Sequence, residues 1–327
     1  MQQIEIKENE AGQRLDKFLH KFMPLAPVSF FYKMLRRKNI TLNGKKAQGS
    51  EKLIVGDTLS FYLSEETIQN FKEKDAASNE YEKAFSTLKG IEIIYEDAQV
   101  LFMNKPAGVL SQKASPSDLS LNEWMIGYLL AENILDEKSL STFKPSVCNR
   151  LDRNTMGLVI GAKTLAGSQK MNQLIKERKI RKFYRMLVKG NVQKEETLEG
   201  FLIKDEKNNK VRLVTKENEE KSAYIKTRFY PVQVYSDKTL IEAELITGKP
   251  HQIRIHLAST GHPLLGDYKY GDRQWNDKYK RRFQVNSQLL YASRLEFPEL
   301  EAPFERLSGQ RIEVPVPEIF ERIMSAK

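Results

Sequence analysis

A polar turn that runs directly into an apolar segment constrains the fold of this chain most strongly. Residues 149–157 read Asn-Arg-Leu-Asp-Arg-Asn-Thr-Met-Gly, and Leu158, Val159 and Ile160 follow. A short apolar run after a turn predicts a buried strand, and the final glycine permits a turn or a close backbone approach. Asp152 lies between Arg150 and Arg153, and nearby positive charge favours the ionised carboxylate. We expect the chemistry here, although such a string also fits a structural ion pair.

Charge and cysteine content restrict the class of protein. The 327 residues carry 53 basic and 43 acidic side chains, for a net charge of +10, which favours a polyanionic partner such as nucleic acid. Cys148 is the single cysteine, which excludes an internal disulfide and a cysteine-based zinc site and fits a reducing compartment. No apolar run approaches the ~18 residues of a membrane span. We expect a cytoplasmic monomer without a membrane partner.

Residues 1–63 are predicted to form a small α/β unit. Ile4 and Ile6 indicate a strand, Ser29 is the expected N-cap of a helix ending near Lys38, and Asn43-Gly44 indicates a hairpin turn. The stretch from residue 29 to residue 46 contains no acid but six cations: Lys33, Arg36, Arg37, Lys38, Lys45 and Lys46. Because solvated surfaces usually mix charge signs, we interpret this patch as a phosphate-binding surface.

The remainder divides into a polar linker at residues 64–90 and a second domain at residues 91–327. Strand patterns outnumber helices there, and no regular strand-helix-strand alternation occurs. This predicts an α+β fold with a central mixed, mainly antiparallel sheet and flanking helices. Residues 250–259 fit a helix with proline in its first turn. Residues 272–283 are interpreted as a polar loop whose cations and rings suit phosphates and unstacked bases.

Several chemistries lack a sequence signature. The four histidines have no zinc-site spacing, no glycine-rich phosphate loop is present, and Ser111 lacks a nucleophile elbow. What remains is Asp152, Tyr184 in a predicted strand and Arg254 in a predicted helix. An aspartate with an arginine partner can act as a nucleophile or a base without a cofactor, and a tyrosine can stack on a nucleobase. These residues do not identify the reaction by themselves.

Four ordered motifs resemble the RluA-type pseudouridine synthases. Residues 149–157 resemble the His-Arg-Leu-Asp-x-x-Thr-Ser-Gly motif of that family, and residues 104–108, Asn-Lys-Pro-Ala-Gly, resemble its first motif. Lys182-Phe183-Tyr184 matches its strand tyrosine, and residues 247–256 with 261–267 resemble its late motif. The resemblance covers residues 91 to about 300. Residues 1–63 resemble the αL RNA-binding module that often accompanies such enzymes.

The resemblance implies a pseudouridine synthase fold and conversion of uridine to pseudouridine in RNA without cofactor or metal. Asp152 is then the catalytic aspartate, attacking the ribose or the uracil or assisting elimination. Arg254 pairs with it, Tyr184 stacks on the flipped uracil, and Arg150 fills the gap left by the base. Two positions depart from the motif, where Asn149 replaces histidine and Met156 replaces serine. Since the aspartate and both arginines remain, we expect activity.

The αL module favours large-subunit ribosomal RNA as the substrate, with tRNA as the alternative. Arg153 and the module cations Arg36, Arg37, Lys45 and Lys46 are the other expected RNA contacts. A different class of protein also fits, a non-catalytic RNA-binding or ribosome-assembly protein that retains the fold. A third hypothesis is an RNA chaperone that acts through its basic patches. These hypotheses differ in whether Asp152 is required.

Overall fold

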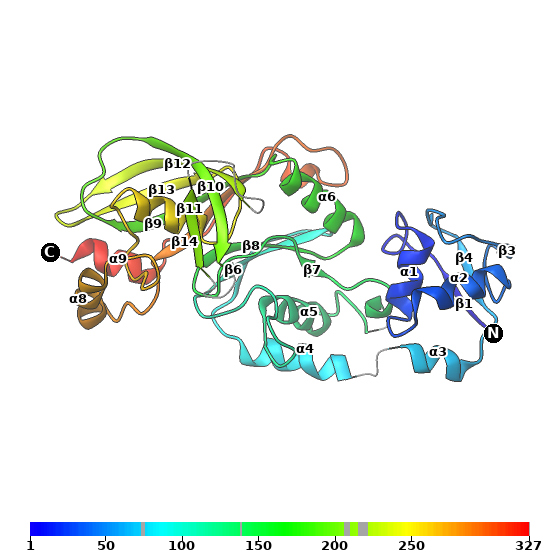
Figure 1. Ribbon diagram of the computed structural model, residues 1–327. Coiled ribbons are helices and arrows are strands. Elements are labelled where there is room, and N and C mark those ends of the chain that lie inside the picture. Colours follow the sequence, from blue (N-terminus) through cyan, green and yellow to red (C-terminus); the bar gives the residue numbers. More distant parts are fainter. Residues whose placement is uncertain (73–75, 138, 206–209, 215–221, 327) are drawn as a thin grey trace.

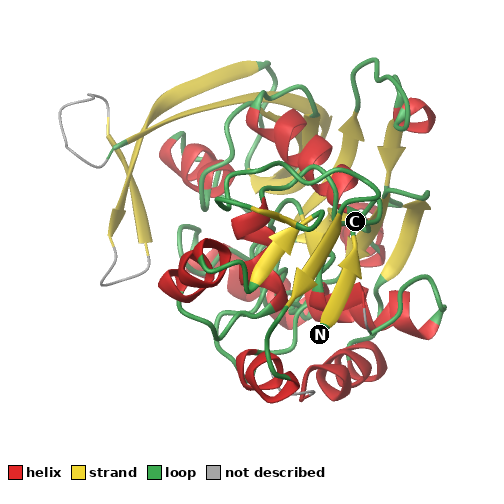
Figure 2. Cartoon of the chain, turned by 90° about the vertical axis from the view of Figure 1, so that its right-hand side faces the viewer, coloured by secondary structure: helices red, strands yellow, loops and turns green. Residues whose placement is uncertain are grey.

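The computed structural model describes residues 1–72, 76–137, 139–205, 210–214 and 222–326. Its strands form one small sheet near the N-terminus and one large sheet in the rest of the chain. Figure 1 shows the small sheet and its helices to one side of the large sheet. The same arrangement viewed from the N-terminal side shows helices packed around the strands (Figure 2). The fold therefore combines helices and strands without regular alternation.

The large sheet carries the middle and the end of the chain. Its strand order is β11-β10-β12-β13-β9-β14-β8-β6-β5, with β15 paired to β14 and β7 paired to β8. The strands are β5 (Glu92–Glu96), β6 (Val100–Lys105), β7 (Ser146–Val147), β8 (Met156–Ala162), β9 (Arg181–Lys189), β10 (Glu196–Asp205), β11 (Lys210–Val214), β12 (Ala223–Val234), β13 (Lys238–Leu245), β14 (Leu290–Glu296) and β15 (Arg311–Glu313).

Among the described strand pairs of this sheet, β14 and β8 are parallel and the others are antiparallel. The predicted mixed, mainly antiparallel sheet is confirmed. Gly157 sits at the parallel pair, opposite Ala292. It has φ +103°, and a Cβ there would overlap the backbone nitrogen and oxygen of Ala292. The glycine thus permits both the turn and the close approach.

Helices flank this sheet. The α4 and α5 helices pack on each other below β6 and β7 in Figure 1, and α8 and α9 lie together at the end remote from the N-terminal unit. The bounds are α4 (Ala76–Thr87), α5 (Leu121–Ala131), α6 (Leu165–Lys176), α7 (Gln252–Ser259), α8 (Arg273–Phe283) and α9 (Glu318–Ser325), with short 3-10 helices at Ser139–Ser141 and Glu305–Leu307.

The N-terminal unit has its own apolar core. Its sheet has the order β1-β4-β2-β3, from β1 (Gln2–Glu5), β2 (Ile40–Leu42), β3 (Lys45–Lys46) and β4 (Thr58–Phe61), with helices α1 (Leu15–Phe22) and α2 (Val28–Arg36). The buried faces of these helices, including Phe18 and Phe31, join Phe61 in one cluster. The predicted Asn43-Gly44 turn is present, with positive φ at both residues. The helix begins at Val28 with Pro27 as N-cap, so the prediction of a Ser29 cap is wrong.

The segment predicted as a linker is largely helical. Helix α3 (Glu65–Phe71) starts at Ser64, whose Oγ accepts from the Thr67 amide at 3.2 Å, and Ile68 packs into the N-terminal core. In α4, Tyr81 packs with Ile126 of α5. Polar composition concealed these helices, because only a few apolar side chains dock each one.

Two other local predictions are wrong. Residues 273–283 form helix α8 rather than a loop, because Asp272 caps it by accepting from the Trp275 amide at 3.0 Å and Trp275 and Tyr279 share its buried face. Many charges on the outer face masked this spacing. Helix α7 begins at Gln252, after His251 in a left-handed conformation with φ 56°, so Pro250 precedes the helix instead of forming its first turn.

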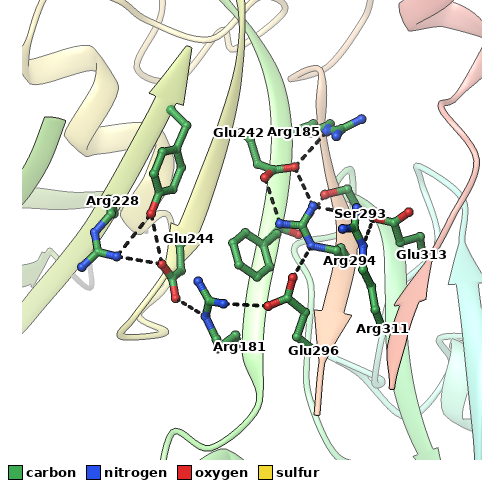
Figure 3. A network of polar contacts seen from close by, with 12 residues as sticks. Arg181, Arg185, Arg228, Glu242, Glu244, Ser293, Arg294, Glu296, Arg311 and Glu313 are labelled. Carbon is green, nitrogen blue, oxygen red and sulfur yellow. Dashed lines mark hydrogen bonds and ion pairs between the residues drawn. The ribbon is translucent and has the colours of Figure 1, made fainter. Parts of the chain in front are cut away.

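Strand alternation gives the large sheet two chemically different faces. On β9, Arg181, Phe183 and Arg185 point to one face, where they meet glutamates of β13 and Arg294 of β14 (Figure 3). Arg294 lies 3.8 Å from the Phe183 ring centroid and donates to Glu242 at 2.9 Å. The intervening side chains point to the other face, which holds the candidate site.

Candidate active site

A cavity of about 920 Å³ lies between the turn at residues 148–155, strand β9 and the start of α7. Asp152, Tyr184 and Arg254 all line it. Asp152 and Arg254 are 102 positions apart in the sequence, and the sheet and α7 bring them together with Tyr184. The three residues that the sequence singled out therefore line one cavity.

Hydrogen bonds fix the turn that carries Asp152. The Ser111 hydroxyl accepts from the Leu151 amide and donates to the Leu151 carbonyl, both at 3.0 Å. The Asn149 side chain accepts from the Ile160 amide at 2.7 Å and donates to the Leu158 carbonyl at 3.4 Å. Asn149, a departure from the family motif, thus ties the turn to β8.

Lys105 holds the same turn from behind. Its buried amine donates to the carbonyls of Pro106, Val109 and Arg153 at 3.0, 2.8 and 3.0 Å. Burial lowers the pKa of Lys105 to about 7, and the charge of Asp152 opposes that shift. Three acceptors match the three donors of an ammonium group, so Lys105 connects residues 104–108 to the turn that carries Asp152.

Arg254 bridges two carboxylates. It donates to Asp267 through Nε at 2.7 Å and through Nη2 at 2.8 Å, and to Asp152 through Nη1 at 3.3 Å. Asp267 is 1% exposed, whereas the side chain of Asp152 is 33% exposed. Burial alone would raise the pKa of Asp267, but the Arg254 bonds and charge hold it below the ordinary value. Asp267 therefore orients Arg254, which stabilises the more accessible Asp152 carboxylate.

His251 is a second basic neighbour of Asp152. Its Nε2 lies 3.8 Å from Asp152 Oδ2, and its Nδ1 lies 2.8 Å from the Tyr270 hydroxyl. Burial lowers the pKa of His251, and the Asp152 charge opposes this while that of Arg254 adds to it. The neutral imidazole is favoured near pH 7, so Arg254 supplies the permanent positive charge.

Gln252 anchors the start of α7. Its side-chain oxygen accepts from the Thr247 hydroxyl at 2.9 Å and the Lys249 amide at 3.0 Å. Its side-chain nitrogen donates to the Lys226 carbonyl at 3.0 Å and the Thr227 hydroxyl at 2.9 Å. This buried amide fixes the helix to β12, which places Arg254 two residues later over the cavity.

Tyr184 projects from the centre of β9, opposite Ala243 of β13. It is 7% exposed and lines the cavity. Burial raises the pKa of Tyr184 well above its usual range, and the Asp152 charge adds to this. The side chain therefore presents a neutral phenol ring to the cavity.

The other predicted residues lie outside this cluster. Arg150 and Arg153 line the cavity rim and are exposed, and in the described structure neither pairs with Asp152, so the prediction that these flanking arginines hold the carboxylate is wrong. Arg153 Nε donates to the Gly108 carbonyl at 3.0 Å. The exposed cations of the N-terminal unit lie away from the cavity lining: Arg36, Arg37, Lys45 and Lys46.

Sequence reasoning missed three site residues, Lys105, His251 and Asp267. The histidines, His251 among them, lack zinc-site spacing in the sequence and were assigned no catalytic role. Lys105 and Asp267 lay inside quoted motifs without an assigned role, and only the folded loops show their contacts. In the described parts of the chain, no cluster of three or more histidine, cysteine, aspartate or glutamate side chains could hold a metal. No helix there is both long enough and apolar enough to span a membrane.

Comparison with known proteins identifies relatives of this chain. The family model described as RNA pseudouridylate synthase matches residues 99–259. "Ribosomal large subunit pseudouridine synthase C" of Vibrio vulnificus is 29% identical over 329 residues, covering 100% of this chain and 96% of the relative. The protein of that name from Vibrio parahaemolyticus is 30% identical over 314 residues, covering 93% of each chain. Its Escherichia coli namesake is 28% identical, covering 90% and 88%.

Solved structures share the fold. Human RNA Pseudouridylate Synthase Domain Containing 4 has a TM-score of 0.57 at 19% identity, covering 75% of this chain and 94% of that one. Human RNA Pseudouridylate Synthase Domain Containing 1 has a TM-score of 0.53 at 19% identity, covering 76% and 87%. Together with the 30% identity over nearly the full length of a curated relative, the four ordered motifs lead to one conclusion: the chain belongs to the RluA-type RNA pseudouridine synthase family.

Proposed function

We propose that this enzyme converts uridine to pseudouridine in large-subunit ribosomal RNA, with Asp152 as its catalytic residue. The observation that carries the proposal is the Asp152–Arg254 pair, at 3.3 Å, in a cavity also lined by Tyr184. The ribosomal substrate is supported by the printed names of the full-length relatives. These names and the cavity favour an enzyme over a non-catalytic binder or a chaperone.

The reaction is an isomerisation. The bond between ribose C1′ and uracil N1 breaks, the base rotates within the site, and a bond forms between C1′ and C5. The proton on C5 is lost and N1 gains one, so atoms and charge balance without an oxidant, a reductant or a cofactor. The Asp152 carboxylate assists cleavage as a nucleophile or base, and Arg254 orients it for that step through their 3.3 Å contact.

The target base must leave its stack to reach Asp152. Tyr184 stacks on the everted uracil, and its neutral hydroxyl remains able to donate a hydrogen bond. Arg150, exposed on the rim, fills the space that the base leaves, and Arg153 contacts the nearby backbone.

The two largest apolar clusters of the described structure, one in residues 1–72 and one in the large sheet and its helices, support a division of function. In this proposal, residues 1–63 bind RNA through the exposed cations Arg36, Arg37, Lys45 and Lys46, residues 64–90 connect the two parts, and residues 91–327 catalyse. In the described structure these four cations have no carboxylate partner, which leaves their charge available to phosphates. Thr142 Oγ1 donates to Glu10 Oε1 at 2.6 Å, so the two parts are in contact.

Purified enzyme incubated with large-subunit ribosomal RNA and, separately, with bulk tRNA tests the substrate class. We expect pseudouridine at one or a few sites of the ribosomal RNA and none above background in tRNA. Formation in tRNA alone would overturn the ribosomal assignment, and formation in neither RNA would contradict the proposed activity. A pseudouridine map of cellular RNA with and without the protein identifies the modified positions.

A further inference from the structure

Lys182 is a cation of the cavity that the mechanism above does not use. It lies two residues before Tyr184 on β9, and both side chains line the cavity. A Cβ built on Gly248 would be 3.6 Å from Lys182 Nζ, so the amine lies beside the Gly248 backbone. In the described structure, no carboxylate or carbonyl group bonds to this amine.

Unlike Lys182, several arginines near this strand have carboxylate partners. Arg254 pairs with Asp267 and Asp152. On the opposite face of the sheet, Arg185 and Arg294 both pair with Glu242 (Figure 3). These carboxylates offset the charges of their arginines, whereas no carboxylate of the described structure offsets the charge of Lys182.

The surroundings of Lys182 disfavour a charge that stays uncompensated. The side chain is half-buried, burial lowers the pKa of Lys182, and the nearby Arg178 lowers it further. A partly desolvated ammonium group is stabilised when an anion binds to it. The anionic group that an RNA strand brings into such a cavity is its phosphate.

We propose that Lys182 binds a phosphate of the RNA strand next to the everted uridine. Lys182 and Tyr184 are two residues apart on β9, a distance of about 6.7 Å along a β-strand. An RNA that places its base on Tyr184 therefore brings an adjoining phosphate near Lys182. The lysine thereby fixes the strand's position, while Asp152 acts on the sugar and base. This inference rests on the proposed function, because it takes RNA as the ligand.

Salt dependence of binding separates a phosphate contact from other roles. Binding of labelled oligouridylate is measured against KCl concentration for wild type, Lys182→Met and Lys182→Arg. Lys179→Met is the matched control, because exposed Lys179 already pairs with Glu177 at 2.8 Å. Each phosphate contact on a single strand contributes about 0.7 to the slope of log affinity against log salt.

We expect Lys182→Met to bind about tenfold more weakly at low salt and to lose about 0.7 of the slope. Lys182→Arg and Lys179→Met should keep the wild-type slope. Weaker binding with an unchanged slope would mean that Lys182 contacts the base, and it would overturn the proposal, as would unchanged binding. If the wild type itself failed to bind RNA, the proposed function would fail as well, so the two failures are distinguishable.

Discussion

Replacing Arg254 with glutamine tests whether the Asp267–Arg254–Asp152 chain is organised as the contacts indicate. Asp267 is 1% exposed and receives two bonds from Arg254, at 2.7 and 2.8 Å. After the replacement, Oδ1 keeps bonds from the Lys269 and Tyr270 amides, but Oδ2 loses its Arg254 donor. Each charge-assisted bond contributes about 1.5–3 kcal/mol, and breaking one buried ion pair costs about 3–5 kcal/mol. Both estimates give a loss of roughly 3–5 kcal/mol in the free energy of unfolding.

The pH dependence of this loss has a defined sign. In the wild type the pKa of Asp267 lies below its ordinary value, so its stabilising contribution is present above the unfolded pKa near 3.9 and disappears only as pH falls through the folded pKa. Without Arg254, burial raises the pKa of Asp267 above its unfolded value. The variant should then regain stability, relative to wild type, as pH falls through that raised pKa, by up to about 1.4 kcal/mol per unit.

Urea denaturation at pH 8 and pH 5 measures both effects, and the double variant Arg254→Gln/Asp267→Asn is the control. It removes the unpaired buried carboxylate, so we expect it to recover roughly half of the lost stability. Catalysis should stay impaired in both variants, because Asp152 has lost its partner. The reasoning would be refuted if Arg254→Gln unfolded with a free energy within about 1 kcal/mol of wild type at pH 8. It would also be refuted if the loss of unfolding free energy grew toward pH 5.

Two further predictions concern backbone packing and a buried histidine. Gly157→Ala places a Cβ against the Ala292 backbone at φ +103° and should lower the free energy of unfolding by about 3 kcal/mol. Gly44→Ala, with open space around it, should lower it by about 1 kcal/mol. Similar losses for the two variants in urea denaturation would be inconsistent with the β8–β14 contact. Burial lowers the pKa of His256 to about 4. The folded state should therefore lose up to roughly 3 kcal/mol of stability as pH falls from about 6.5 to 4. His256→Gln should flatten this part of the plot of unfolding free energy against pH, and the replacement of exposed His20 by glutamine should leave it unchanged.

The sequence predicted those parts of the site that depend on local pattern. A segment that begins basic and ends apolar predicted the strand that carries Tyr184, and the polar turn before an apolar run placed Asp152. The ion-pair partner of Asp152 was harder to predict, because Arg150 and Arg153 lie near it in sequence but are exposed at the cavity rim. Arg254 was identified through motif resemblance. Its partner Asp267 comes from a loop that folds back on α7 and places the carboxylate beside Arg254.

Other features required tertiary context. The outer face of α8 is so charged that its buried Trp275 and Tyr279 were interpreted as parts of a loop. The role of Lys105 depends on the bond from its amine to the Arg153 carbonyl, 48 residues away. The Lys105 contact is non-local, so composition and periodicity do not register it.

The central claim is that Asp152 carries the chemistry. Asp152→Asn preserves size and leaves the Ser111 and Lys105 bonds to the turn in place. The decisive measurement is therefore pseudouridine formation in large-subunit ribosomal RNA by this variant, with binding of the same RNA measured in parallel. The account predicts no pseudouridine above background and RNA affinity within about threefold of wild type. Pseudouridine formation at the wild-type rate would contradict it.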